Sequence, residues 1–153
     1  MSALPHPAPS FRPMRVEDLD AVSAIEQRIY EFPWTRGNFA DSLIARYECT
    51  VMTCDSTIVG YAILALGAGE AHLLNLSIDA PWQGKGLGRA LLLHQIDLAR
   101  SRGARLMVLE VRPSNVVARA LYEDVGFRQI TVRRGYYPAA QGREDALLLA
   151  LEL

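Results

Sequence analysis

The chain has 153 residues, of which 50% are hydrophobic and 22% are charged, so it can form the core of one domain of ordinary size. Its formal net charge of −1 argues against a nucleic-acid-binding protein, because phosphate contacts normally require an excess of basic residues. No apolar run approaches the roughly 18 residues that are needed to cross a bilayer.

Residues 1–9 are broken by prolines, and we expect a short disordered tail before a single domain at residues 10–153. This tail lacks the basic and apolar segments of a signal peptide. Cys49 and Cys54 fall in one predicted strand, about 17 Å apart at ~3.3 Å per residue, which is too far for a disulfide. We therefore expect reduced cysteines and a cytoplasmic protein. The three histidines lie far apart in the sequence, and we expect no metal site.

The first half of the chain is predicted to contain two helices. Apolar residues recur at helical spacing from Val16 onward, and Pro33 ends this segment. Thr35 is a suitable N-cap for a second helix that runs to about Ala45. Strands are expected at Phe11–Arg15, Glu48–Thr53, Ile58–Leu66 and Glu70–Ile78.

The second half is predicted to alternate helices with strands. An amphipathic helix at Gly86–Arg102 ends at Gly103, and the apolar run at Arg105–Val111 is typical of a strand in the centre of a sheet. A short helix starts at Asn115 and ends at Gly126. The closing hairpin is expected at Phe127–Tyr137 and Glu144–Leu153.

A glycine-rich turn lies between the strand that ends at Ile78 and the amphipathic helix. Gly84, Gly86 and Gly88 alternate with other residues, which leaves backbone amides uncovered at the start of a helix. Such amides and the positive end of the helix dipole form a site for an anion such as a pyrophosphate. The spacing matches neither the P-loop nor the dinucleotide-binding pattern. A glycine-rich helix start without a ligand is the alternative.

The turn Gln83-Gly84-Lys85-Gly86-Leu87-Gly88 resembles the acetyl-CoA loop of the GNAT superfamily of N-acetyltransferases, Q/R-x-x-G-x-G/A, at every fixed position. The order of predicted elements is also similar to that of this superfamily over nearly the whole chain. The resemblance implies an α/β (α+β) fold with a mixed, mostly antiparallel sheet of seven strands and helices on both faces. It further implies a splayed pair of parallel strands at the acetyl-CoA site.

Two residues could carry acyl transfer to an amine, which requires a neutral amine and a proton for the departing thiolate. Glu110 interrupts the apolar run Leu106–Val111, and partial burial there is expected to raise its pKa. Tyr122, in the next helix, could donate a proton to the thiolate.

Structural alternatives exist for both residues. Glu110 could be paired with Arg105 or Arg112, and Tyr122 could be a packed aromatic residue. Glu70 and His72 could act as a base through water, or could be solvated strand residues.

Further segments resemble the RimI family, bacterial acetyltransferases of the N-terminal alanine of a small-subunit ribosomal protein. The matching segments are residues 32–34 (FPW), 109–115 (LEVRPSN), 120–127 (ALYEDVGF), 133–138 (RRGYYP) and 142–146 (GREDA). By this resemblance Glu110 accepts a proton and Tyr122 donates one. The residues implied to contact acetyl-CoA are Leu76, Ser77, Ile78, Gly84, Lys85, Gly86, Leu87, Gly88, Arg89 and Asn115.

The same resemblance implies that aromatic residues on two loops, Phe32, Trp34, Tyr136 and Tyr137, line a slot for a peptide N-terminus. They could instead be ordinary aromatic anchors. Acetyl-CoA is then the co-substrate, no metal takes part, and the partner is the N-terminal peptide of a ribosomal protein, with neither nucleic acid nor membrane bound. We expect a monomer or a weak homo-oligomer. Other protein N-termini, lysine side chains or small amines are alternative substrates, and a non-catalytic acyl-CoA sensor is an alternative of another class.

Overall fold

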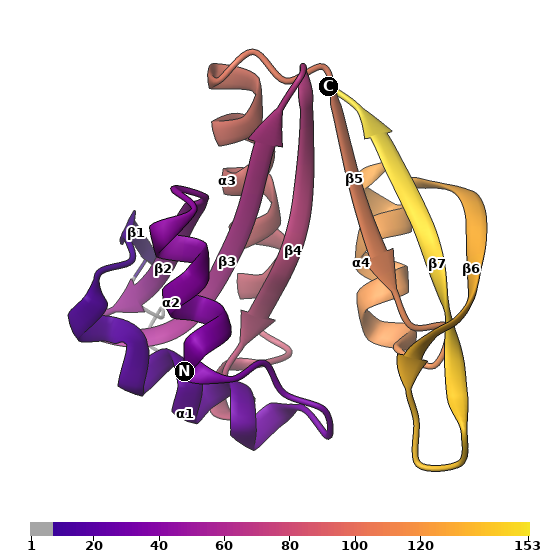
Figure 1. The fold of residues 1–153 in the computed structure, drawn as a ribbon. Coiled ribbons are helices and arrows are strands. Elements are labelled where there is room, and N and C mark those ends of the chain that lie inside the picture. Colours follow the sequence, from indigo (N-terminus) through magenta and orange to yellow (C-terminus); the bar gives the residue numbers. More distant parts are fainter. Residues whose placement is uncertain (1–7) are drawn as a thin grey trace, which may run out of the picture. The chain divides into compact units, whose positions relative to one another are not determined.

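The computed structural model describes residues 8–153, so most of the predicted tail lies outside the described residues. In chain order the elements are β1 (Ser10–Pro13), the 3-10 turn η1 (Val16–Asp18), α1 (Leu19–Ile29), α2 (Arg36–Ile44), β2 (Glu48–Cys54), β3 (Thr57–Gly67), β4 (Glu70–Ile78), the 3-10 turn η2 (Ala80–Trp82), α3 (Leu87–Ser101), β5 (Leu106–Val111), α4 (Val116–Val125), β6 (Arg128–Pro138) and β7 (Arg143–Glu152). Figure 1 traces this order along the ribbon. Each predicted helix and strand is present, and most boundaries agree closely.

The strands form one seven-stranded sheet in the order β1-β2-β3-β4-β5-β7-β6. β1 pairs antiparallel with β2, and β7 pairs antiparallel with both β5 and β6. β4 and β5 are parallel, and they pair at Glu70–His72 with Leu106–Val108. The predicted mixed sheet of the GNAT type is therefore confirmed.

The chain divides into two compact units. The first comprises the residues up to Ile63 together with Asn75–Leu91, and the second comprises Leu64–Leu74 and Leu92–Leu153. The strands β3 and β4 and the helix α3 each contribute residues to both units.

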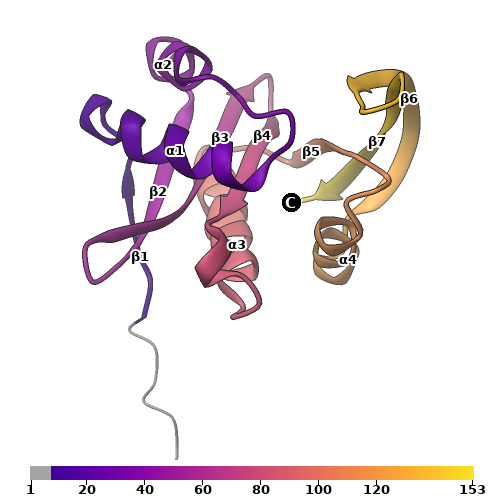
Figure 2. The same ribbon diagram turned by 90° about the horizontal axis from the view of Figure 1, so that it is seen from below.

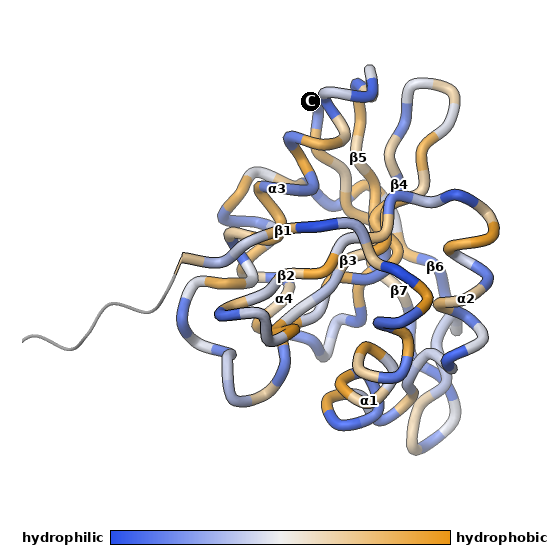
Figure 3. Tube along the Cα trace, turned by 90° about the vertical axis from the view of Figure 1, so that its left-hand side faces the viewer, coloured by the Kyte–Doolittle hydropathy of each residue, from blue (hydrophilic) through white to orange (hydrophobic). Residues whose placement is uncertain are grey.

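In the first unit, α1 and α2 cover one face of the strands (Figure 2). Polar and apolar residues alternate along α1 (Figure 3), and its apolar residues Leu19, Val22 and Ile25 are buried. The Phe39 ring of α2 packs edge-on against Tyr61 of β3, with 5.5 Å between the ring centroids. Apolar stripes on the two helices thus build the core of this unit.

The first helix starts later than the sequence predicts. Val16–Asp18 forms the 3-10 turn η1, because the Asp18 carboxylate accepts hydrogen bonds from the Arg15 backbone N–H (2.8 Å) and from the Arg12 guanidinium (2.7 and 2.8 Å). Asp18 is buried, and Arg12 holds its pKa below the usual range by hydrogen bonding. The regular helix begins at Leu19.

In the second unit, α4 lies against one face of β5 and β7 (Figures 1 and 2). Met107, Leu109 and Val111 of β5 are buried, whereas the residues between them are only partly covered. Gly126 ends α4 in the left-handed region at φ 118°, as the sequence predicts. A Cβ atom at Gly126 would lie 3.4 Å from Leu151 of β7, so helix and strand are closely packed there.

Both cysteines are buried, and no disulfide joins them. Of the helices in residues 8–153, none combines the length and apolarity needed to cross a membrane.

Candidate active site

The glycine-rich turn belongs to the first unit. The Asp79 carboxylate caps η2 by accepting the Ala80 N–H at 2.9 Å, and the Gln83 side-chain amide donates to the Ile78 carbonyl at 2.9 Å. Gly84 and Gly86 have φ angles of 76° and 80°, in the region that favours glycine. The helix α3 then begins at Leu87.

The backbone of the turn borders open space at two of its glycines. A Cβ atom at Gly84 or at Gly86 would meet no atom within 4 Å, and both glycines are exposed, so this side of the turn is open. Lys85 and Arg89 are exposed beside it. Exposed amides, two basic residues and a helix N-terminus together suit a diphosphate such as that of coenzyme A.

The strand that leads into the turn is constrained by a glycine that sequence reasoning missed. A Cβ atom at Gly60 of β3 would lie 2.8 Å from the Ser77 carbonyl oxygen and 2.7 Å from the Ile78 side chain. Ser77 and Ile78 are buried, and Leu76 is half-buried. A larger residue at position 60 would displace the backbone of β4 just where acetyl-CoA is expected to bind.

A buried carboxylate on α1 holds the aromatic loop that follows this helix. Glu26 is 2% exposed, and it accepts hydrogen bonds from the Trp34 backbone N–H (2.8 Å), the Tyr61 hydroxyl (2.7 Å) and the Asn75 side-chain amide (3.1 Å). This role could not be predicted from the sequence, because the partners come from three other segments. Glu26 thus fixes the position of Trp34.

The hydrogen bonds continue from Asn75 to Tyr30. The Ser77 hydroxyl donates to the Asn75 side-chain oxygen at 2.6 Å, so the Tyr30 hydroxyl, 2.6 Å from Ser77, must donate to it. Burial raises the pKa of Tyr30 to about 12, which keeps this hydroxyl protonated. The loop residue Phe32 is 40% exposed, whereas the Trp34 ring packs on a buried phenylalanine, Phe39, at 5.1 Å.

Glu110 belongs to the second unit and is paired with residues from other strands. Its side chain is 8% exposed, Oε2 lies 2.7 Å from Nε2 of His72 on β4, and Oε1 lies 3.8 Å from the Arg133 guanidinium on β6. The arginine that faces Glu110 is thus Arg133, not Arg105 or Arg112, which the sequence left open as alternative partners; Arg112 pairs with Glu144.

The expected direction of the Glu110 pKa is also wrong. Burial does act to raise it, but the hydrogen bond from His72 has the larger effect, so the pKa of Glu110 is lowered. His72 is therefore not simply a solvated strand residue.

Tyr122 and Asn115 lie on the short helix of the second unit. Tyr122 is 7% exposed, and its ring packs edge-on against Phe127 with 5.6 Å between centroids. The Asn115 side chain accepts the Ala118 N–H at 3.2 Å and so caps α4, as its position in the sequence predicts.

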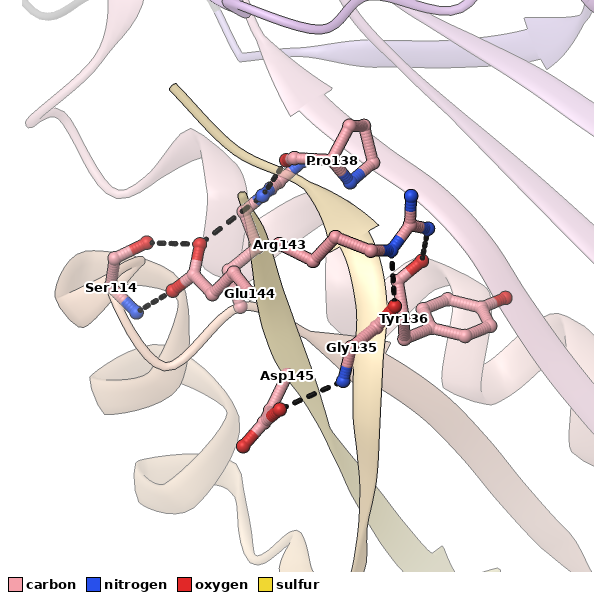
Figure 4. A network of polar contacts seen from close by, with 8 residues as sticks. Ser114, Gly135, Tyr136, Pro138, Arg143, Glu144 and Asp145 are labelled. Carbon is pink, nitrogen blue, oxygen red and sulfur yellow. Dashed lines mark hydrogen bonds and ion pairs between the residues drawn. The ribbon is translucent and has the colours of Figure 1, made fainter. Parts of the chain in front are cut away.

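The segment 142–146 ties the closing hairpin to the start of α4. Figure 4 shows Glu144 beside Ser114, whose backbone N–H and hydroxyl both donate to the carboxylate, at 2.9 and 3.0 Å. The Arg112 guanidinium donates to the same carboxylate at 3.1 Å and to the Pro138 carbonyl at 2.7 Å. Glu144 thereby fixes the residue before the cap of α4.

The same hairpin positions the two tyrosines of β6. Asp145 accepts the Gly135 N–H at 2.8 Å, and Arg143 donates to the Gly135 and Tyr136 carbonyls (Figure 4). The Tyr136 and Tyr137 rings lie edge-on, 4.9 Å apart between centroids. Arg143 and Asp145 therefore anchor the backbone of β6 beside the two tyrosines.

The predicted site residues are distributed over both units. Those of the first unit are Phe32, Trp34, Leu76, Ser77, Ile78, Gly84, Lys85, Gly86, Leu87, Gly88 and Arg89. Those of the second unit are Glu110, Asn115, Tyr122, Tyr136 and Tyr137. In the described part of the chain, no group of three or more histidine, cysteine, aspartate or glutamate side chains could hold a metal ion.

Comparison with known proteins identifies the family of the chain, because a family model and a similar protein agree. The family model of the acetyltransferase (GNAT) family matches residues 19–127. The [ribosomal protein bS18]-alanine N-acetyltransferase of Escherichia coli K12 is 44% identical over 140 residues, which cover 92% of this chain and 95% of the relative.

Solved structures are similar over the same length. The crystal structure of the ribosomal-protein-S18-alanine N-acetyltransferase from Escherichia coli has a TM-score of 0.89 at 42% identity, and the match covers 95% of this chain and 94% of that one. The structure of yncA from Salmonella typhimurium with its cofactor acetyl-CoA has a TM-score of 0.81 at 21% identity, over 95% of this chain and 94% of that one, which shows a shared fold.

Proposed function

Because the chain belongs to the acetyltransferase (GNAT) family, we propose that it transfers an acetyl group from acetyl-CoA to the N-terminal alanine of ribosomal protein bS18. The observation that carries this proposal is the 44% identity to the Escherichia coli enzyme named for that reaction, over nearly the full length of both chains. The segments at residues 32–34, 109–115 and 133–146 support it, because they supply the aromatic loops and the carboxylate that such a reaction needs.

The co-substrate binds through the turn at residues 83–89. Its exposed amides at Gly84 and Gly86, with Lys85 and Arg89, hold the diphosphate of acetyl-CoA. Asn115, which caps α4, is a further residue that we assign to acetyl-CoA binding. The Ile78 backbone N–H donates to the thioester carbonyl oxygen and stabilises the charge that develops there.

The amine is activated by Glu110, and the thiolate is protonated by Tyr122. A free α-amino group has a pKa of about 7.7–8.0, against about 10.4 for lysine, so a modest base suffices to deprotonate it near neutral pH. A carboxylate at position 110 promotes this proton loss. The Tyr122 hydroxyl then supplies the proton for the departing thiolate, and the second proton that the nitrogen loses as the amide forms restores this hydroxyl.

Transfer is direct, within a complex that holds both substrates. A covalent route would need a reactive thiol, but both cysteines are buried, and burial raises the pKa of Cys49 to about 11. Cys54 also has a raised pKa for the same reason. Such thiols form little thiolate at neutral pH and are poor nucleophiles.

The aromatic loops select the first residue of the peptide. Phe32 and Tyr136 are 40% and 43% exposed, so their rings are available to contact a substrate. A carboxylate binds the backbone of each loop: Glu26 accepts the Trp34 N–H, and Asp145 accepts the Gly135 N–H. Rigid aromatic walls accept a methyl side chain and exclude bulkier ones. The reaction takes place in the cytoplasm, where ribosomal proteins are made.

A peptide series tests this function. Peptides with the bS18 N-terminal sequence are prepared with alanine, valine or leucine at the first position, and one alanine peptide carries a blocked α-amino group and an internal lysine. We expect kcat/KM to be highest for alanine and transfer to the blocked peptide to be undetectable. Equal rates across the series, or transfer to lysine, would indicate a different amine substrate. Binding of acetyl-CoA without any turnover would indicate a sensor.

A further inference from the structure

His72 is the close polar neighbour of Glu110, and the function proposed above gives it no part. Its Nε2 atom lies 2.7 Å from Oε2 of Glu110, within the second unit. His72 pairs with Val108 in the parallel register of β4 and β5, and Glu110 is two residues further along β5. Residues two apart on a strand share a face, so the two side chains meet on the same face of the sheet.

The two partners differ in their access to solvent. The His72 side chain is 36% exposed, whereas that of Glu110 is 8% exposed. Among the described residues, Nδ1 of His72 has no hydrogen-bond partner, while both carboxylate oxygens of Glu110 face a nitrogen atom, of His72 or of Arg133. The imidazole is thus the part of the pair with an unused lone pair.

We propose that His72 and Glu110 work as a pair in which the imidazole takes up the proton lost by the attacking ammonium, while the carboxylate holds the imidazole in place. This inference rests on the proposed function and assigns its base. It accounts for a feature that Glu110 alone does not explain, namely a carboxylate already engaged on both oxygens.

The proton balance is simple. The Nε2–H group of His72 donates a hydrogen bond to the Glu110 carboxylate, so the lone pair of the neutral imidazole lies on Nδ1. An N–H bond of the substrate ammonium breaks, an Nδ1–H bond forms on His72, and the neutral amine attacks the thioester. Glu110 stays ionised and stabilises the imidazolium, which afterwards returns its proton to water. The lowered pKa of Glu110 agrees with a carboxylate that remains charged throughout.

Other ionisable groups near the pair bear on its pH dependence. Arg133 of β6 faces the second oxygen of Glu110 at 3.8 Å, and Tyr137 of β6 interacts electrostatically with Glu110. Glu70 precedes His72 on β4 and is exposed. The end of β3 carries no ionisable side chain in residues 64–67.

The test compares His72→Gln, Glu110→Gln and the double variant by steady-state kinetics with the alanine peptide. We expect each single variant to lower kcat by ~10²-fold or more, and the double variant to be no slower than the worse single one, because the residues act as a unit. The KM for acetyl-CoA should change less than about twofold. His94→Gln on α3 is the matched control and should retain wild-type kcat.

A second measurement separates chemistry from structure. The His72→Ala variant, shown to be folded by thermal unfolding, is assayed with added imidazole, and we expect saturable recovery of rate. A kcat within about twofold of wild type in His72→Gln, or no recovery with imidazole in folded His72→Ala, would overturn the inference alone. Lack of transfer by the wild-type chain would overturn the proposed function as well.

Discussion

At the scale of single residues, Tyr122 can be tested without disturbing its packing. Its ring lies edge-on to Phe127 in the core of the second unit, and Tyr122→Phe retains that contact. If the hydroxyl protonates the thiolate, kcat should fall by ~10²-fold while the KM for acetyl-CoA stays nearly constant. Tyr47→Phe, at a tyrosine that is 39% exposed, serves as the control and should leave kcat unchanged. Wild-type kcat in Tyr122→Phe would remove this residue from the mechanism.

Asp18 makes a prediction about stability and pH. Arg12 lowers the folded-state pKa of Asp18, so its stabilising effect is complete above the ordinary pKa of about 3.9 and is lost as the pH falls toward the folded value. Asp18→Asn should lower the free energy of unfolding by about 1.5–3 kcal/mol at neutral pH, and by less in acid. Urea unfolding at about pH 7 and about pH 3 measures this.

The control for Asp18 is the exposed ion pair of Asp20 and Arg36, in which the Asp20 side chain is 87% exposed. Asp20→Asn should change stability little at either pH. An Asp18→Asn deficit that is the same at both pH values would show that the carboxylate charge is not the source of the stability.

The residues that the sequence could not interpret have partners that are distant along the chain. Glu110 was recognisable as a carboxylate in an apolar strand, but the direction of its pKa depends on His72, which is 38 residues away. The amphipathic pattern of α1 predicts the helix but not the role of Glu26 on it. Glu26 accepts hydrogen bonds from groups that lie 8, 35 and 49 residues away in the sequence. Pattern and spacing carry no information about such contacts.

At the scale of elements, local signals were sufficient. Thr35 caps α2 by accepting the Asn38 N–H, and Gly126 ends α4 at a positive φ, so both ends were predictable from residue type. One boundary differs from the prediction, although the contacts that set it are also local. The turn η1 replaces the expected first helical turn, because Asp18 binds Arg12 and Arg15 rather than leaving the backbone to form a regular helix.

Gly60 provides a test of the β3–β4 contact in the first unit. A Cβ atom there would lie 2.8 Å from the Ser77 carbonyl oxygen, which is backbone and cannot rotate away. Gly60→Ala should therefore lower the free energy of unfolding by about 1–3 kcal/mol and raise the KM for acetyl-CoA. Gly67→Ala, on the same strand with no atom within 4 Å, is the matched control. Equal free energies of unfolding for the two variants would show that the β4 backbone can shift away from the added Cβ atom without loss of stability.

Helix α3 contains a polar side chain that is buried without hydrogen bonds to other described residues. Gln95 is fully buried, and in the described part of the chain neither its amide nitrogen nor its oxygen has a hydrogen-bond partner. Gln95→Leu should raise the free energy of unfolding by about 1–3 kcal/mol, because it removes an unpaired polar group at similar volume. Urea unfolding measures the gain, with Gln27→Leu on the exposed side of α1 as the control. A destabilised Gln95→Leu would indicate that a bound water satisfies the amide.

At the scale of the whole molecule, the segments that predicted the function are spread over both units. The co-substrate turn and the first aromatic loop belong to the first unit, and the carboxylate, the tyrosine on α4 and the closing hairpin belong to the second. Short motifs identified these segments because each depends on local backbone geometry. The hydrogen-bond networks behind them, centred on Glu26 and Glu144, could only be found in the folded chain.

The proposed reaction transfers one acetyl group to the α-amino group of a leading alanine. The most direct measurement is mass spectrometry of bS18 incubated with the purified chain and acetyl-CoA, with fragmentation to locate the modification. We expect a single acetyl group on the first residue, and none when acetyl-CoA is omitted. An unmodified N-terminus, or acetyl groups found only on lysine side chains, would contradict it.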